Sequence, residues 1–183
     1  VKDLGRLDSS VRSAEQTALA RFSTDSDIPQ WNRNLLRLAD ARGLTAIETA
    51  RMLAMAHVAG GDAMIGCFDA KYHYLSWRPR QAIWRADTDG NPLTEPPDLT
   101  WTSFVPTPNH PEYPSAHSCV TPTSGIVVSE FLKTPEIDFT IPSLTGLGDR
   151  HYDRAKDLEY EVSNARIWGG IHFRSAVEDG VKI

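Results

Sequence analysis

The residues best suited to chemistry in this chain are cations and histidines in three short segments. The first segment contains Lys71 and Arg78 among tyrosines and a tryptophan, and ends at Pro79. The two cations are seven positions apart, close to two helical turns, so they would share one helix face. This arrangement predicts a pocket for an anion. The alternative is a pair of surface cations whose stems cover apolar side chains.

The second segment is Pro114-Ser115-Ala116-His117-Ser118, which follows a proline-rich stretch and is expected to open a helix. A helix N-terminus offers free N–H groups and a partial positive charge, which suit an oxyanion. Ser115 can donate its hydroxyl, and His117 can transfer a proton near neutral pH. The alternative is an ordinary serine cap beside a surface histidine.

The third segment contains Arg166 and His172, which would not share a face of an unbroken helix. Gly169-Gly170 lies between them and is expected to break the helix, which lets the two side chains converge. With Lys71 and Arg78, the three segments supply three cations, enough to match a trianionic tetrahedral oxyanion. The alternative is a helix-terminal arginine beside a buried histidine.

The order of these motifs, Lys-x6-Arg-Pro, then Pro-Ser-(Gly)-His, then Arg-x5-His, resembles that of the vanadium-dependent haloperoxidases. The related type-2 phosphatidic acid phosphatase superfamily shares it. The connecting sequence, such as Trp77-Arg-Pro-Arg-Gln-Ala-Ile and Thr107-Pro-Asn-His-Pro-Glu-Tyr-Pro-Ser, is more similar to haloperoxidase-type bacterial proteins than to lipid phosphatases. The resemblance covers the chain from about Leu4 to its end.

This resemblance implies an all-α fold, a helical bundle of the vanadium chloroperoxidase and acid phosphatase type. It implies that His172 is the axial vanadium ligand or, in a phosphatase, the phosphoryl-accepting nucleophile, and that His117 is the acid–base residue. The implied ligands of the oxygens of vanadate, or of phosphate in the same site, are Lys71, Arg78, Ser115, the backbone N–H of Ala116, and Arg166.

The chain departs from the family pattern at two positions. Ala116 stands where glycine is usual, which is tolerable if the local φ is negative because the N–H remains. Ala176 stands where an aspartate usually holds the axial histidine in its tautomer. Losing such a partner lowers the affinity for the metal by roughly 10- to 100-fold. Glu178 or Asp179 are the candidates to replace it, although their helical phase differs.

Three functions follow from these residues. The first is a vanadium-dependent haloperoxidase or peroxidase, in which vanadate-bound hydrogen peroxide oxidises a halide. The second is a soluble acid phosphatase that acts on a phosphate ester through a phosphohistidine at His172. The third is an inactive oxyanion-binding domain, with Ala176 as its signature. Activity that requires vanadate would separate the first from the second, which vanadate would inhibit.

Composition excludes several other classes of protein. The 183 residues carry a formal net charge of −5, which argues against a general nucleic-acid surface. No apolar run approaches the roughly 18 residues of a membrane span. Cys67 and Cys119 form no CxxC motif and are interpreted as buried free thiols, with a bridge between them left open.

We expect residues 1–183 to form a single haloperoxidase-like helical domain that is a fragment of a longer, trimmed chain, with homo-oligomerisation left open. The sequence does not assign a compartment, although a secreted or periplasmic location is favoured.

His110 lies in the loop predicted over 87–114 and is interpreted as a surface residue, the alternative being that it shapes halide or substrate access.

The elements expected to position the three segments are mainly helices. The predicted elements are a helix from Val11 to Phe22 capped by Ser9-Ser10, a turn at 25–29, a helix from Gln30 to Arg42 stopped by Gly43, a long helix capped by Thr45 and Glu48 that runs through Gly60-Gly61 toward Tyr74 in a region ended by Pro79, a loop over 87–114, a helix from Ser115 to Leu132, an irregular stretch over 134–147 with a short extended piece at Phe139-Thr140-Ile141, a helix over 149–167 and a final helix from about Phe173.

Overall fold

The structure is a computed structural model that describes residues 1–24, 27–143 and 146–183, and most of these residues lie in helices. In chain order the elements are α1 (Ala14–Phe22), α2 (Asp27–Ala41), α3 (Ala46–Tyr74), α4 (Pro79–Trp84), the short 3-10 helix η1 (Ala86–Thr88), α5 (Ala116–Leu132), the strands β1 (Glu136–Pro142) and β2 (Asp149–Arg154), α6 (Ala155–Trp168) and α7 (Arg174–Gly180). The predicted helical bundle is confirmed, with one two-stranded hairpin added to it.

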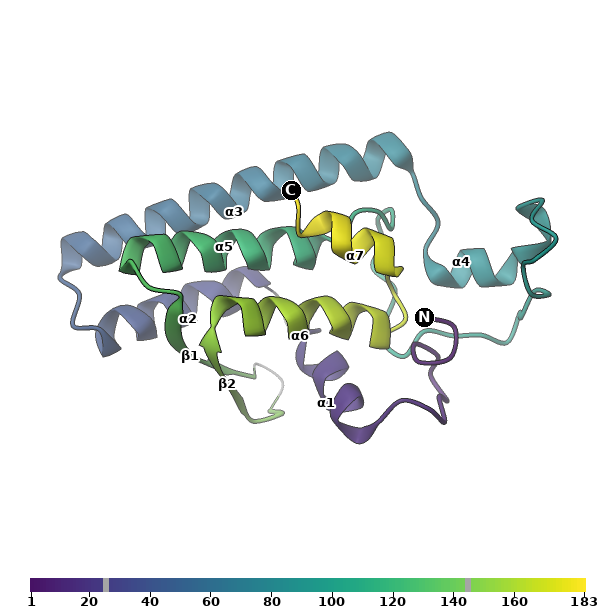
Figure 1. The fold of residues 1–183 in the computed structure, drawn as a ribbon, viewed down its shortest axis with the longest axis horizontal. Coiled ribbons are helices and arrows are strands. Elements are labelled where there is room, and N and C mark those ends of the chain that lie inside the picture. Colours follow the sequence, from purple (N-terminus) through teal and green to yellow (C-terminus); the bar gives the residue numbers. More distant parts are fainter. Residues whose placement is uncertain (25–26, 144–145) are drawn as a thin grey trace.

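The long helices lie side by side along the molecule (Figure 1). α3 covers one edge and packs along α5, while α6 packs on the other side of α5 and carries α1 and α7. The main apolar core lies between α2, α3, α5, α6 and the hairpin, and its fully buried side chains include Leu35, Met52, Val128 and Ile137. α4 and the loop after it extend away from this bundle (Figure 1). Among the described residues, no helix is both long and apolar enough to cross a membrane.

The predicted start of α3 is confirmed by a complete capping box. The side chain of Thr45 accepts a hydrogen bond from Glu48 N, and the Glu48 carboxylate accepts one from Thr45 N at 2.8 Å. The preceding helix α2 ends just before Gly43, which has a φ of 62°, as expected for a glycine that follows a helix. These two local signals define the turn between α2 and α3.

The first two predicted boundaries are wrong. α1 begins at Ala14, because Ser13 and Gln16 form the capping box, whereas Ser9 accepts hydrogen bonds from Val11 N and Arg12 N in a turn. α2 begins at Asp27, so the predicted turn is wrong from residue 27 on, and residues 25–26 lie outside the described residues. Pro29 is tolerated in the first turn of a helix because an N–H there would have no intrahelical acceptor.

Lys71 and Arg78 do not share a helix, contrary to the prediction. α3 ends at Tyr74 with Leu75 in the left-handed conformation, at a φ of 50°. Pro79 does not end this region. It is the first residue of α4, a position that its fixed φ and missing N–H favour. Lys71 is therefore on the last turn of α3, and Arg78 is the N-cap residue of α4.

The predicted helix over 149–167 is wrong for its first six residues. These residues form β2, which pairs antiparallel with β1, and α6 starts only at Ala155. β1 buries Ile137, Phe139 and Ile141 and exposes the residues between them, which is the two-residue alternation of a half-buried strand. The hairpin is stabilised because this apolar face packs against α2 and closes the core. The ring centroids of Trp31 on α2 and Phe139 on β1 lie 5.4 Å apart.

The loop over 87–114 is held in place by the N-terminal segment. Leu7 N donates to Thr102 O at 2.8 Å, and Phe104 N donates to Gly5 O at 2.8 Å. The fully buried Trp101 donates from Nε1 to Lys2 O at 2.8 Å. These long-range contacts fix the loop that leads into α5 and carries Glu112.

Candidate oxyanion-binding site

His172 is the centre of the site and is only 2% exposed. Its Nδ1 lies 2.9 Å from Glu112 Oε1, which also accepts a hydrogen bond from Phe173 N at 2.9 Å. Because a carboxylate accepts here, we assign the proton to Nδ1, which leaves a lone pair on Nε2. Arg78 donates to this Nε2 over 3.0 Å. The imidazole is thus oriented with its basic nitrogen toward a guanidinium.

Burial determines the charge of the histidine and of its partner. Desolvation lowers the pKa of His172 well below its usual value, and the neighbouring Arg78 and Arg166 lower it further. Desolvation also raises the pKa of Glu112 to about 7, against the opposing effects of the Phe173 N–H and of Arg78. His172 is therefore a neutral imidazole in this environment, as a metal ligand or nucleophile must be.

Arg78 links α4, the long loop and the turn that carries His172. Its guanidinium donates to His110 O at 3.1 Å, to Ile171 O at 2.8 Å and to Pro111 O at 3.3 Å. It also contacts His110 Nδ1 at 3.1 Å. Desolvation lowers the pKa of Arg78 to about 10, which leaves it charged at neutral pH.

Lys71 is fully buried at the end of α3. Its Nζ donates to Pro111 O and Glu112 O, both at 3.0 Å, and also to Pro114 O. Desolvation lowers the pKa of Lys71 to about 8, and the charge of Arg78 lowers it further, against the opposing effect of Glu112. An ammonium group has three N–H donors, so an oxyanion at Lys71 would replace one of these carbonyl groups.

The Gly169-Gly170 break brings Arg166 and His172 to the same site, as the sequence predicts. α6 ends at Trp168, and Gly170 has a φ of 78°. Ile171 N then donates back to Arg166 O at 3.2 Å. Arg166 is 4% exposed, donates to Ser23 O, and lies close enough to Arg78 to lower its pKa.

The second motif lies at the N-terminus of α5, as predicted. Ser115 is the N-cap residue, and its hydroxyl accepts a hydrogen bond from Ser118 Oγ at 3.0 Å. Ala116 is not among the described non-glycine residues with positive φ, so alanine fits where glycine is usual. The N–H of Ala116 belongs to the first turn, where helices leave donors without intrahelical acceptors.

His117 is half-buried next to the same centre. It borders a small hollow of about 10 Å³ between α1, α2, α5 and α6, on the scale of one water molecule. Its charge would lower the pKa of both His172 and His110, which places it near these two rings. The structure thus brings all of the predicted site residues to one end of the bundle.

Glu112 is the partner of His172, and none of the three sequence motifs includes it. Ala176 is fully buried on α7, and its carbonyl accepts a hydrogen bond from Ser115 N at 2.9 Å. Asp179 instead accepts from Tyr113 at 3.1 Å and from Lys182 at 2.6 Å, and Glu178 is exposed. The carboxylate comes from the loop before α5. The signal was an acidic residue between prolines, three positions before Ser115.

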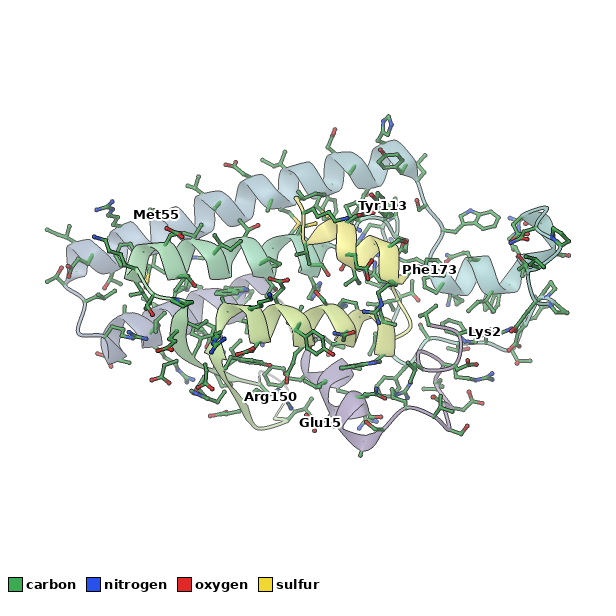
Figure 2. All side chains as sticks on the ribbon, viewed as in Figure 1. Lys2, Glu15, Met55, Tyr113, Arg150 and Phe173 are labelled. Carbon is green, nitrogen blue, oxygen red and sulfur yellow. The ribbon has the colours of Figure 1, made fainter. Side chains whose placement is uncertain are left out.

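His110 was also misinterpreted as a surface residue. It is half-buried between Arg78 and Phe68, whose ring centroid lies 5.2 Å from that of His110. Desolvation, together with Lys71 and Arg78, lowers its pKa to about 4. Figure 2 shows Tyr113 and Phe173, the neighbours of Glu112 and His172, at this same end of the molecule.

The site has more positive than negative charge. Around His172 the described residues contribute three buried cations, Lys71, Arg78 and Arg166, and the one carboxylate of Glu112. Buried charges are stable only when they are paired, so this excess favours an added anion. A tetrahedral oxyanion could accept hydrogen bonds from all three cations in place of carbonyl groups. The donor set therefore fits vanadate or phosphate, whose central atom would take the place of Arg78 at the Nε2 lone pair of His172.

Lys71, Arg78 and Arg166 surround the imidazole of His172 at one end of a helical bundle, and these three cations are called the cradle below. The family model of the VCPO second helical-bundle domain matches residues 51–183 of this chain. This is more than half of the sequence, and the matched part holds every residue of the cradle. The chain therefore belongs to this family, which is that of the vanadium haloperoxidases.

Solved structures of vanadium-dependent enzymes have the same fold. A bacterial vanadium-dependent iodoperoxidase is 28% identical, with a TM-score of 0.79 over 93% of this chain and 41% of its own. The apo and holo forms of a bacterial vanadium-dependent chloroperoxidase are 19% and 20% identical, with TM-scores of 0.76 and 0.74. They cover 93% and 94% of this chain, and 42% of their own chain in each case, and at these identities they show the fold alone.

This chain thus spans about two fifths of the length of these structures. None of the curated proteins compared with it gives a significant match.

Proposed function

We propose that this chain carries the vanadate-binding centre of a vanadium-dependent haloperoxidase, which uses hydrogen peroxide to oxidise a halide. The observation that carries the proposal is the buried excess of positive charge around a neutral His172. The likeness to the iodoperoxidase supports it, since at 28% identity that protein shares more than the fold with this chain.

In this proposal, each residue of the cradle has a separate role. Lys71, Arg78 and Arg166 bind the oxygens of the oxyanion and neutralise its charge, together with Ser115 and the N–H of Ala116. Vanadate, when bound, acts as a Lewis acid that makes peroxide reactive toward halide. The residues of the chain bind and orient it.

The two histidines have different roles because their surroundings differ. His172 provides the Nε2 lone pair to the central atom, and Glu112 keeps its Nδ1 protonated and its ring in place. His117 is half-buried beside the small hollow and accepts or donates the proton.

A soluble phosphatase is the second candidate, because phosphate and vanadate share shape and charge. The Glu112–His172 pair supports this candidate as well, since the same lone pair on Nε2 could attack a phosphoryl group and Glu112 would stabilise the resulting positive charge. In this candidate too, Glu112 would provide the carboxylate partner of His172 that Ala176 cannot provide.

The test divides one purified, metal-free sample into two halves and loads one with orthovanadate. Each half is assayed for peroxide-dependent bromination and iodination and for hydrolysis of p-nitrophenyl phosphate. We expect oxidation of halide only in the loaded half, and loss of it in the His172→Ala variant. The matched control is His73→Ala, since His73 is exposed on α3.

Hydrolysis confined to the vanadate-free half and abolished by vanadate would replace the proposal with the phosphatase. Vanadate binding without turnover of either kind would leave an oxyanion-binding domain.

A further inference from the structure

The two cysteines of the chain meet behind the oxyanion cradle. Cys67 lies on α3 and Cys119 on α5, and both are free and buried, with 0% and 1% exposure. Both belong to one small apolar cluster that also contains Ala116. They are the only two cysteines of the sequence, so any disulfide within the chain must join them.

Both thiols also contact the backbone that begins α5. Cys67 Sγ lies 3.8 Å from Pro114 O, and Cys119 Sγ lies 3.1 Å from Ser115 O. Lys71 donates to the same Pro114 carbonyl group. Any movement of the two sulfur atoms therefore acts directly on the peptide that holds Ser115 and on one acceptor of Lys71.

The two thiols lie against consecutive carbonyl groups, those of Pro114 and Ser115, within one apolar cluster. This places the two cysteines next to each other, one on α3 and one on α5. Cys67 is taken as the attacking cysteine, because it shares α3 with Met64 and Phe68, and Cys119 as the resolving one.

A hollow that can hold a small oxidant lies one layer of side chains from this pair. Met64 and Phe68 pack against the cysteine cluster. The same two side chains line an apolar hollow of about 460 Å³ between α2, α3 and α5, next to Gly60 and Gly61. One layer of side chains therefore separates Cys67 from a space large enough for hydrogen peroxide.

We propose that Cys67 and Cys119 form a reversible disulfide that reports exposure to peroxide and changes the oxyanion cradle. The Cys67 thiolate attacks one oxygen of hydrogen peroxide, which breaks the O–O bond and yields a sulfenic acid and hydroxide. Cys119 then attacks that sulfur and releases water. In total, two thiols and one peroxide give one disulfide and two waters, and a dithiol reductant restores the thiols.

The disulfide alters the cradle because it shortens the distance between α3 and α5. The bond brings the two sulfur atoms to about 2.05 Å apart. Both then cease to be donors to the carbonyl groups of Pro114 and Ser115. We expect the oxidised protein to bind vanadate at least about tenfold more weakly, the scale of losing a supporting contact at such a site.

The chemical test treats the reduced chain with hydrogen peroxide, quenches it in acid and denaturant, alkylates free thiols and maps the peptides by mass. We expect a linked peptide pair that contains Cys67 and Cys119, no alkylation at either, and full recovery of both thiols after dithiothreitol. Cys119→Ser should accumulate the sulfenic acid or its over-oxidised forms at Cys67. Met64 in the same digest shows whether oxidant reached the hollow.

The proposal is overturned if Met64 is oxidised while both cysteines stay alkylatable, or if the cysteines cross-link only between chains. Vanadate affinity is then measured on the reduced and oxidised protein by equilibrium dialysis. Equal affinities would refute the effect on the cradle. If the reduced chain binds no vanadate at all, the proposed function fails, whereas the disulfide is still decided by the peptide map.

Discussion

At the scale of single residues, the site depends on a contact between positions far apart in the sequence. Glu112 and His172 are 60 positions apart and meet at 2.9 Å with both side chains buried. The carboxylate fixes the tautomer of the imidazole and holds the Phe173 N–H as well. We expect this one carboxylate to take the part of the aspartate that is usual at the position of Ala176.

Substituting Glu112→Gln should weaken vanadate binding by roughly 10- to 100-fold, the usual effect of losing the charged partner of a metal-ligating histidine. The glutamine oxygen can still accept both hydrogen bonds, so the fold should be kept while the negative charge is lost. Equilibrium dialysis followed by elemental analysis for vanadium measures the effect. Glu178→Gln, an exposed change on α7, is the control. Equal affinity in both variants would contradict the role assigned to Glu112.

Phosphate affinity should fall as the pH rises above about 8, because the anion-free pKa of Lys71 is about 8. A bound anion stabilises the ammonium and raises this pKa, so between the free and the bound pKa each pH unit costs up to about tenfold in affinity. Calorimetric titration from neutral to alkaline pH follows this slope. Lys71→Met should bind more weakly and lose the slope, and Lys182→Met, at an exposed position, should retain it. A slope that survives in Lys71→Met would assign the dependence to another group.

At the scale of elements, the turn between α6 and α7 sets the geometry of the third motif. Gly170 has a φ of 78°, and a Cβ there would lie 2.1 Å from Gly5 O. The N-terminal segment and this turn therefore pack backbone against backbone. This close approach places Ile171 and His172 opposite Arg166 and Arg78.

Substituting Gly170→Ala should destabilise the protein by about 3 kcal/mol or more, since the clash with backbone adds to the strain of a positive φ. Chemical denaturation measures the free energy of unfolding. Gly61→Ala is the matched control within a helix, because a Cβ at Gly61 meets nothing within 4 Å. That variant should be more stable by about 0.5–1 kcal/mol, from helix propensity alone. If both variants lost stability equally, the contact with Gly5 would not be the cause.

At the scale of the whole molecule, a chain with a net charge of −5 holds a buried cluster of positive charge. The overall charge makes nucleic acid an unsuitable ligand, whereas the local excess at Lys71, Arg78 and Arg166 suits a small oxyanion. Away from this cluster, ion pairs connect neighbouring elements at the surface. An example is Arg150 on β2, whose Nη2 lies 2.8 Å from Oε1 of Glu15 on α1 (Figure 2).

A bound oxyanion should therefore stabilise the fold. Phosphate or vanadate at 100 times its Kd should add about 2.7 kcal/mol to the free energy of unfolding, a rise of roughly 5–11 °C in Tm for a domain of this size. Thermal denaturation with and without the anion measures it, and sodium chloride at the same ionic strength is the control. Arg166→Met should show a smaller rise. An equal rise with chloride would indicate a general salt effect.

The sequence by itself determined the features that depend on neighbouring residues. Thr45 with Glu48 and the glycine at 43 defined the turn between α2 and α3, because caps are local. The order of the three motifs predicted the candidate residues of the cradle, and the family model matches the part of the chain that contains them. Ser13 was missed as the cap of α1 because two earlier serines offered the same local signal.

Only the tertiary structure decided which distant groups meet. The break at Leu75 puts Lys71 and Arg78 on separate elements, yet the loop carbonyl groups of residues 110–114 gather both. The predicted extended piece at 139–141 is confirmed as the middle of β1, whereas the rest of the hairpin was not predicted, because the strands are stabilised by burial against α2. Glu112 reaches His172 only because the N-terminal segment fixes the loop before α5, and packing of that kind has no local pattern in a sequence.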